Sequence, residues 1–185
     1  MFIQTEPTPN PLTMKFIPGV DVMGNSTQNT LFLTSAEEAK ISPLASDLFR
    51  IAGVTAIFLG SDFITVTRAP DQEWETLKPL ILPAIMDHFV AGKPVILESA
   101  TSSSGNDDDS EIVKQIRELI DTRVRPAVAQ DGGDIIFRGF VDGIVQLEMH
   151  GSCSGCPSST ATLKGGIENM LKHYIPEVIA VEAVA

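Results

Sequence analysis

The chain has little cysteine, a minority of basic residues and no long apolar run. Of its 185 residues only two are cysteine, and 13 Lys and Arg stand against 24 Asp and Glu, which gives a formal net charge of -11. Nucleic-acid-binding proteins present basic surfaces, and anionic membranes attract basic segments. No apolar run reaches the roughly 20 residues that a membrane-spanning helix needs. The composition therefore argues against nucleic-acid and membrane partners.

The first residues lack a targeting pattern. Residues 1–7 have neither the positive start and apolar core of a secretion signal nor the arginine-rich amphipathic pattern of a transit peptide. We therefore expect a cytoplasmic protein, with the mitochondrial matrix as the alternative if the chain is a processed form. The cysteine count fits a reducing compartment. The two cysteines are so close that a disulfide between them would close only a tiny ring and stabilise the fold little.

A polar segment divides the chain. Residues 99–110 read Ser-Ala-Thr-Ser-Ser-Ser-Gly-Asn-Asp-Asp-Asp-Ser. Small polar residues and three adjacent aspartates cannot bury surface, so we predict a flexible linker. A long loop within one domain is the alternative, but such loops are uncommon in compact folds. We therefore predict an α+β protein with two small domains, at residues 1–98 and 111–185.

The N-terminal domain shows mixed strand and helix patterns. A short helix is predicted from Pro43 to Ile51, with Ser42 as its N-cap. Apolar runs predict short strands at residues 31–33, 54–59 and 63–67. No residue in this domain suggests catalysis.

A second helix is predicted after these strands. Apolar residues recur at helical spacing from Trp74 to Phe89, and Gly92 marks the end. Pro79 and Pro83 fall inside this pattern, so we expect a late start or a kink. His88 is expected on the helix surface.

The C-terminal domain predicts the order helix, strand, strand, helix, strand. Ser110 can cap a helix whose apolar face continues until Pro126, which should kink or end it. The Asp-Gly pair at 142–143 predicts a two-residue hairpin turn between two alternating strands. A helix is expected from about Ser158, in which a Gly-Gly pair should allow close packing, and a final strand at residues 178–184.

Both cysteines lie in one short loop. Residues 151–159 read Gly-Ser-Cys-Ser-Gly-Cys-Pro-Ser-Ser, which places Cys153 and Cys156 just before the second predicted helix. Pro157 suits a first helical position. The positive end of the helix dipole favours a thiolate at the cysteine that precedes it. The small neighbours leave room for a bound group or a partner.

Three functions compete for this C-x-x-C pair. A dithiol–disulfide switch uses the same strand, loop and helix. A zinc site needs two more Cys or His ligands, but His88 lies across the linker, His173 lies at the far end of the helix, and the strand alternation makes His150 a solvated residue. An iron–sulfur cluster also takes four ligands, normally cysteine thiolates. Two chains that meet loop to loop would supply four.

Longer motifs resemble a known family. Residues 125–134, Arg-Pro-Ala-Val-Ala-Gln-Asp-Gly-Gly-Asp, together with the hairpin and the cysteine loop, closely resemble the C-terminal NifU domain. By itself the Asp-Gly-Gly-Asp segment 131–134 reads as a turn that ends a helix. Several N-terminal segments resemble the Nfu N-terminal domain, at residues 2–5, 7–11, 15–19, 49–54 and 62–67.

The resemblance implies a non-enzymatic iron–sulfur carrier of the Nfu type. Such a carrier receives a cluster from upstream donors and passes it to apo iron–sulfur proteins. The family pattern makes Cys153 and Cys156 the ligands of a [4Fe–4S] cluster held between two subunits of a homodimer, with a [2Fe–2S] form as the alternative. The cysteine-rich assembly domain of larger NifU scaffolds has no counterpart here, which favours transport of preformed clusters. The enzyme alternative is a thiol–disulfide oxidoreductase, weakened because Gly and Ser around the pair offer no apolar platform for a substrate peptide.

Overall fold

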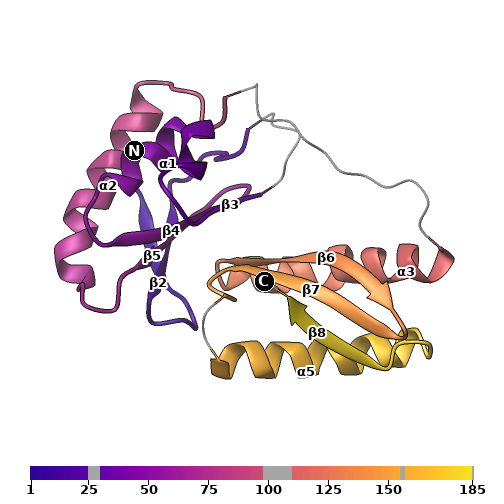
Figure 1. Ribbon diagram of the computed structural model, residues 1–185. Coiled ribbons are helices and arrows are strands. Elements are labelled where there is room, and N and C mark those ends of the chain that lie inside the picture. The colour runs from indigo at the N-terminus through magenta and orange to yellow at the C-terminus, as the bar shows by residue number, and fades with distance from the viewer. Residues whose placement is uncertain (25–29, 98–109, 155–156, 185) are drawn as a thin grey trace. The chain divides into compact units, whose positions relative to one another are not determined.

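The computed structural model describes residues 1–24, 30–97, 110–154 and 157–184, with the side chains of residues 157–159 left out (Figure 1). The chain forms two compact units, Met1–Ser102 and Ser103–Ala185. Each unit contains one sheet with helices, which confirms the predicted α+β class. The predicted linker lies outside the described residues except for Ser110.

The first unit is built on a five-stranded antiparallel sheet in the order β1-β2-β5-β4-β3. The strands predicted from apolar runs appear as β3, β4 and β5. The first two strands were not predicted, and all four residues of β1 are exposed. The strands are β1 (Gln4–Pro7), β2 (Thr13–Ile17), β3 (Leu31–Leu33), β4 (Val54–Leu59) and β5 (Ile64–Arg68).

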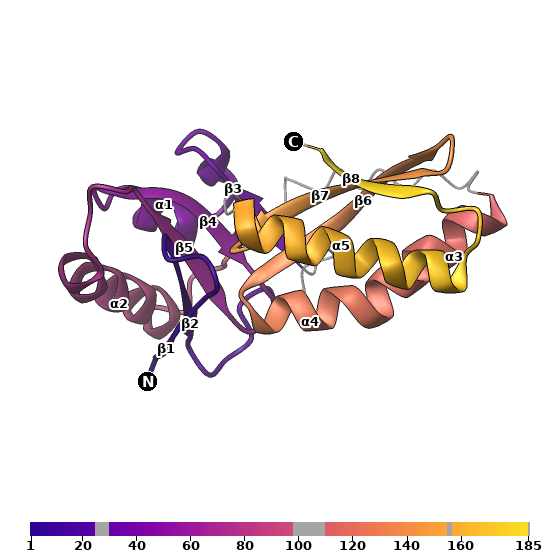
Figure 2. The ribbon, with the colours of Figure 1, turned by 90° about the horizontal axis from the view of Figure 1, so that it is seen from below.

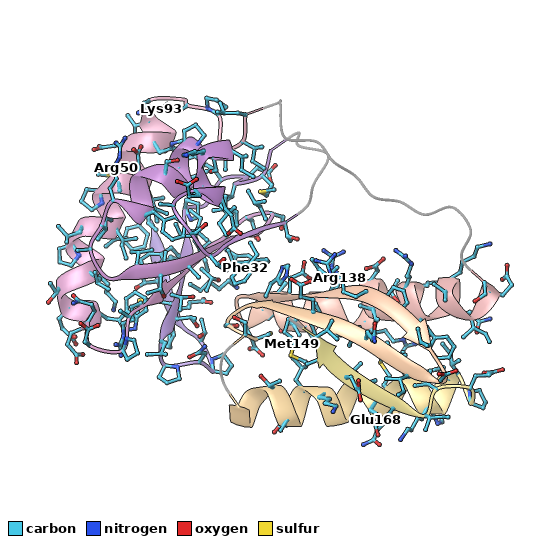
Figure 3. All side chains as sticks on the ribbon, in the orientation of Figure 1. Phe32, Arg50, Lys93, Arg138, Met149 and Glu168 are labelled. Atoms are coloured by element: carbon cyan, nitrogen blue, oxygen red, sulfur yellow. The ribbon has the colours of Figure 1, made fainter. Side chains whose placement is uncertain are left out.

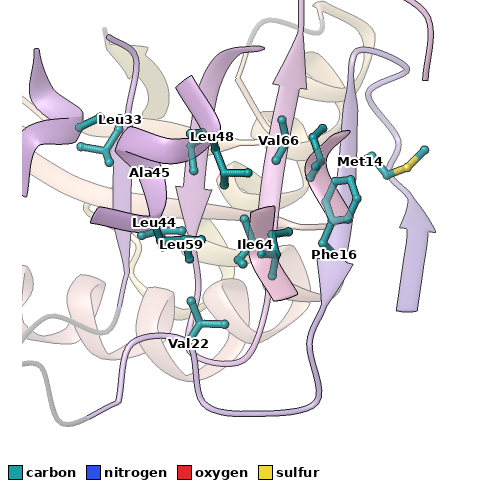
Figure 4. Close-up of a cluster of buried hydrophobic side chains, with 14 of the residues drawn as sticks. Met14, Phe16, Val22, Leu33, Leu44, Ala45, Leu48, Leu59, Ile64 and Val66 are labelled. Carbon is teal, nitrogen blue, oxygen red and sulfur yellow. The ribbon is translucent and has the colours of Figure 1, made fainter. Parts of the chain in front are cut away.

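Two helices and a 3₁₀ turn, Glu38–Ile41, complete this unit. Helix α1 (Pro43–Phe49) begins as predicted, because the Ser42 hydroxyl accepts a hydrogen bond from the Ala45 N–H at 3.2 Å. Figure 4 shows side chains of α1 and of the sheet converging in the core of the unit. The labelled members of this cluster include Phe16, Leu44, Leu48, Leu59, Ile64 and Val66.

Helix α2 (Trp74–Val90) runs through both of its prolines. The predicted late start is therefore wrong. The Trp74 indole N–H donates to the Pro11 carbonyl at 3.3 Å, which ties the first turn to the β1–β2 connection. His88 is only 1% exposed, so its predicted surface position is also wrong. The packing of α2 against α1 and the sheet buries the imidazole of His88, although the side chain is polar.

The second unit begins with a helical segment in three parts: α3 (Glu111–Leu119), a π-helical turn (Ile120–Val124) and α4 (Arg125–Gln130). The Ser110 hydroxyl caps α3 by accepting from the Val113 N–H at 3.4 Å. The alternative that Pro126 ends the helix is wrong, because the helical path continues to Gln130. Pro126 lies in the first turn of α4, where a missing N–H is tolerated, and the wider π turn precedes it.

The sheet of the second unit has three strands in the order β6-β7-β8. Strands β6 (Gly133–Val141) and β7 (Ile144–Gly151) are antiparallel, and Asp142 and Gly143 form the predicted turn with φ of 52° and 79°. Helix α5 (Pro157–Tyr174) then leads to β8 (Ala180–Val184), which runs parallel to β7. The predicted order of helices and strands is confirmed.

The three helices of this unit lie together on one side of its sheet (Figure 2). Their apolar residues form one core with the alternate residues of β7, as the sequence pattern predicts. Its most buried members are Ile116, Ile120, Ile135, Val145, Leu147, Leu171 and Val181. Among the helices that the structure describes, none is long and apolar enough to cross a membrane.

Candidate metal centre

The cysteine loop begins where the central strand β7 ends. Gly151, the last residue of β7, has φ of 63°, a conformation that glycine adopts without strain. The Ser154 N–H donates to the Gly151 carbonyl at 3.1 Å, so the chain turns sharply at this point. The Thr160 hydroxyl of α5 donates to the Cys153 carbonyl at 3.2 Å. The loop is therefore tied to the elements on both sides of it.

The first cysteine is buried in the core of the second unit. Cys153 is 6% exposed and packs within the same apolar cluster as Val128 and Met149. Burial raises the pKa of its thiol to about 11, and the negative charges of Asp131 and Asp134 add to this, whereas the Ser152 hydrogen bond opposes it. Cys153 is therefore a neutral thiol in this state.

The structure describes one of the two predicted ligands, Cys153. Helix α5 begins at Pro157, as predicted. Cys156 lies outside the described residues, so the thiolate expected just before the helix stays a prediction. At Cys153 the environment raises the pKa of the thiol instead of lowering it, because burial disfavours the charged thiolate.

The Asp-Gly-Gly-Asp segment forms a floor beneath the loop. The Ser152 N–H donates to the Gly132 carbonyl at 3.2 Å, and the Ser152 hydroxyl donates to the Asp131 carbonyl. A β-carbon on Gly133 would come within 2.5 Å of the Cys153 sulfur, so only glycine allows the sulfur this close. The segment also ends α4, with Gly132 at φ of 79°, as the sequence predicts. Its support of the cysteine loop was not predicted.

An ion pair between the half-buried Arg125 and the buried Asp134 holds this segment in place. The Arg125 Nε and Nη2 donate to the two oxygens of Asp134, each at 2.8 Å. Asp134 is only 3% exposed, and its Oδ1 also accepts from the Ile135 N–H at 2.8 Å. These hydrogen bonds raise the pKa of Arg125, although burial opposes the shift. Both residues belong to the motif that the sequence singled out, but their pairing is a tertiary contact that spacing does not reveal.

His150 is paired on the sheet surface rather than solvated. It is 8% exposed, and its Nε2 lies 2.7 Å from Glu148 Oε1. Glu148 also accepts from Arg138, which lies on β6 (Figure 3). The Arg138 hydrogen bond, with help from His150 and against the effect of burial, lowers the pKa of Glu148. The prediction that His150 is solvated is therefore wrong.

The described residues do not assemble a complete metal site within one chain. In residues 1–24, 30–97, 110–154 and 157–184, no three His, Cys, Asp or Glu side chains are placed to hold a metal ion together. His150 is occupied by Glu148, and His173 lies against the Tyr174 ring with centroids 5.1 Å apart. The zinc interpretation therefore finds no histidine ligand beside Cys153 among these residues.

The fold and loop define a class of protein: two small α+β units, one of which presents a paired-cysteine loop on a glycine-rich floor. Comparisons with known proteins agree. Residues 3–92 match the family model "Scaffold protein Nfu/NifU N terminal", and residues 116–182 match "NifU-like domain". This chain belongs to the NifU-like scaffold family, in the group that joins these two domains. Scaffolds are not catalysts, which confirms the expectation that the chain is not an enzyme.

The relatives extend over the whole chain. The "NFU1 iron-sulfur cluster scaffold homolog, mitochondrial" of Drosophila virilis is 53% identical over 186 aligned residues, which cover 100% of this chain and 62% of the fly protein. The human protein of the same name is also 53% identical, with 72% of its length covered. A solved NifU-like protein from Saccharomyces cerevisiae is 25% identical, with a TM-score of 0.48 over 55% of this chain and 87% of that one. The chain thus spans less than two thirds of the fly relative.

Proposed function

We propose that this chain carries iron–sulfur clusters: two copies hold one [4Fe–4S] cluster through Cys153 and Cys156 of each, and they release it to apo-proteins. The observation that carries the proposal is the ligand count. A cluster of this type takes four protein ligands, normally thiolates. The 185 residues of this chain contain two cysteines, and both lie in the same loop. A second copy related by twofold symmetry supplies the other two.

The state of Cys153 supports transport rather than permanent storage. Its thiol is buried and neutral in the cluster-free chain. A sulfur shared across two subunits has to leave the core and lose its proton, so loading requires the loop to open and release protons. The reverse movement returns the sulfur to an apolar environment that favours the free thiol.

The oxidoreductase alternative is disfavoured by the same observation. Thiol–disulfide exchange depends on a thiolate, and reactive C-x-x-C cysteines have lowered pKa values. Cys153 has its pKa raised to about 11. The reduced protein should therefore show no insulin reduction above a Cys153→Ala control. Rapid insulin reduction that depends on both cysteines would favour the enzyme over the carrier.

Anaerobic reconstitution tests the proposal. Reduced apo-protein is incubated with ferrous iron and sulfide, and the product is desalted and analysed for metal, sulfide and mass. We expect about four iron and four sulfide per two chains and a dimer held by the cluster. Mössbauer spectra distinguish this product from a [2Fe–2S] form, which would use the same four thiolates. A loaded monomer whose cluster is fully ligated by one chain would contradict the proposal.

Single substitutions test the ligands. Cys153→Ala and Cys156→Ala should each prevent stable cluster binding, because each removes two thiolates from the dimer. His150→Gln is the matched control, since His150 is the histidine nearest in sequence and is not proposed as a ligand. If either cysteine variant keeps the full cluster, the assignment of that residue is wrong.

The kinds of donor and acceptor protein follow from the same chemistry. An acceptor must be an apo iron–sulfur protein whose own thiolates replace those of the carrier, and a donor must release preformed clusters.

The relatives are named as mitochondrial proteins, whereas the sequence predicts the cytoplasm. Both compartments keep thiols reduced, as the proposal requires. Imaging of the tagged chain in its own cells distinguishes the two locations.

A further inference from the structure

We propose that Arg125 and Asp134 are positioning residues, whose ion pair fixes the position of the Cys153 sulfur by holding the segment 131–134 in place. This inference rests on the proposed role of Cys153 as a ligand. Neither residue is proposed to touch the cluster. They act through the segment 131–133, on which the cysteine loop lies.

The geometry of the pair leaves Asp134 no freedom to rotate. The two hydrogen bonds from Arg125 are parallel and of equal length, 2.8 Å, and the Ile135 N–H holds Oδ1 from a third direction, also at 2.8 Å. Only an arginine offers this planar fork to a carboxylate. Since Arg125 lies on α4 and Asp134 on β6, the pair fixes the end of that helix against the start of that strand.

Three contacts pass this constraint to the cysteine loop. Gly132 and Asp131 accept the two hydrogen bonds of Ser152, next to the cysteine. Gly133 lies directly against the sulfur of Cys153 and pairs with Gly151 across the sheet. A shift of the 131–134 segment would therefore move the sulfur with it.

The charge of Arg125 matters as well as its shape. A loaded loop carries thiolate sulfurs beside a carboxylate that is 3% exposed. With Arg125 in place the carboxylate is neutralised by a partner in direct contact. Without it, an unpaired negative charge would stand in the core close to the anionic ligands. Supporting residues of this kind typically change metal affinity about 10–100-fold when they are lost.

The test uses the full chain and compares Arg125→Lys with two controls. Arg125→Lys keeps the charge but loses the fork, so the loaded dimer should lose its cluster to a chelator about tenfold faster or more, with an altered visible circular dichroism spectrum. Arg138→Lys changes the other arginine–carboxylate pair of this sheet, with Glu148. Asp121→Asn removes the more exposed partner of Arg125. Both controls should keep the parental cluster lifetime and spectrum.

A stability control separates positioning from mere folding. Val181→Ala opens a cavity in β8, far along the chain from the loop, at a residue that is 0% exposed. It should lower the melting temperature and leave the cluster spectrum unchanged. The double variant Arg125→Met/Asp134→Leu replaces the pair by apolar side chains and can retain the fold. If the double variant folds and holds the cluster as long as the parent, the positioning role is overturned.

A second measurement needs no cluster. In the Cys156→Ala background Cys153 is the only thiol, and its iodoacetamide labelling in the folded apo-protein reports the position of the sulfur. Arg125→Lys should increase this labelling rate, and Arg138→Lys should not. Equal rates in both would overturn the proposal. If the parent chain binds no cluster but these rates differ as expected, the proposed function fails and the positioning role stands.

Discussion

Gly133 and Cys153 lie in direct contact, with the sulfur in the space that any side chain at position 133 would occupy. The contact joins the first residue of β6 to the residue two positions beyond the end of β7. The backbone of the Asp-Gly-Gly-Asp segment thus sets the place of the sulfur in the cysteine loop. Several outcomes depend on this arrangement.

Gly133→Ala should displace the thiol and weaken cluster retention. The added methyl group would lie 2.5 Å from the sulfur and 2.9 Å from the His150 carbonyl, so the loop has to shift. Overpacking of this kind typically costs about 1–3 kcal/mol. Urea unfolding of the apo-protein and chelator-driven cluster loss measure the two effects.

Gly165→Ala is the matched control for that variant. Gly165 lies inside α5, and a β-carbon there or at Gly166 meets nothing within 4 Å, so the predicted close packing at this Gly-Gly pair is wrong. The change should stabilise the apo-protein by roughly 0.5–1 kcal/mol and leave cluster loss unaltered. Equal cluster loss in the two alanine variants would show that the contact with the sulfur is unimportant.

The thiol of Cys153 should make the fold sensitive to alkaline pH. Its pKa is raised from 9.0 to about 11 by burial. A raised pKa in the folded state gives stability that is complete below the unfolded pKa and is lost as the pH rises through the folded pKa. The free energy of unfolding of the Cys156→Ala variant should therefore fall between about pH 9 and about pH 11. In the Cys153→Ala/Cys156→Ala variant that part of the decline should be absent.

His88 should make the first unit sensitive to acid. Burial lowers the pKa of its imidazole, Lys93 adds to the shift, and Asp47 opposes it. A histidine with a lowered folded pKa gives stability that is present above its unfolded pKa, near 6.5, and is lost as the pH falls. The protection of the α2 amides against hydrogen exchange, relative to the intrinsic rate at each pH, should fall below that pH. This loss of protection should disappear in His88→Leu, and if it persists another group is responsible.

Ser152→Ala should loosen the loop without abolishing it. The substitution removes the hydroxyl that donates to the Asp131 carbonyl and also the hydrogen bond that lowers the pKa of Cys153. The backbone bond to Gly132 remains. We expect a loss of about 1 kcal/mol in stability and a further rise in the pKa of Cys153. Thermal unfolding and the pH dependence of iodoacetamide labelling measure these effects, and an unchanged labelling profile would contradict the second.

Local patterns were enough to predict much of this fold. The residues of β4 form an apolar run that is mostly β-branched or aromatic, and the strand has the predicted bounds of 54–59. The cap at Ser42 and the turn at 142–143 were also predicted, because each depends on a few neighbouring residues. Strand β1 was not, since its side chains are exposed and only pairing with β2 makes it a strand.

The place of the candidate site between a strand and a helix was predictable, but the contacts that support it were not. The sequence places Cys153 between a strand and a helix, as the structure does. Its burial depends on the register that pairs Gly133 with Gly151, a contact between distant segments. Both histidines expected near solvent, His88 and His150, are buried for the same reason: side-chain polarity does not reveal which neighbours cover a residue in the folded chain.

The position of β7 has a mechanical consequence. It is the central strand, bonded to β6 along one edge and to β8 along the other. Sliding it would break both ladders, whereas a change in the turn after Gly151 would break the hydrogen bonds of Ser152 and Ser154 and leave the ladders in place. The proposed binding and release of a cluster would therefore change the turn after Gly151 and leave the two ladders of the sheet intact.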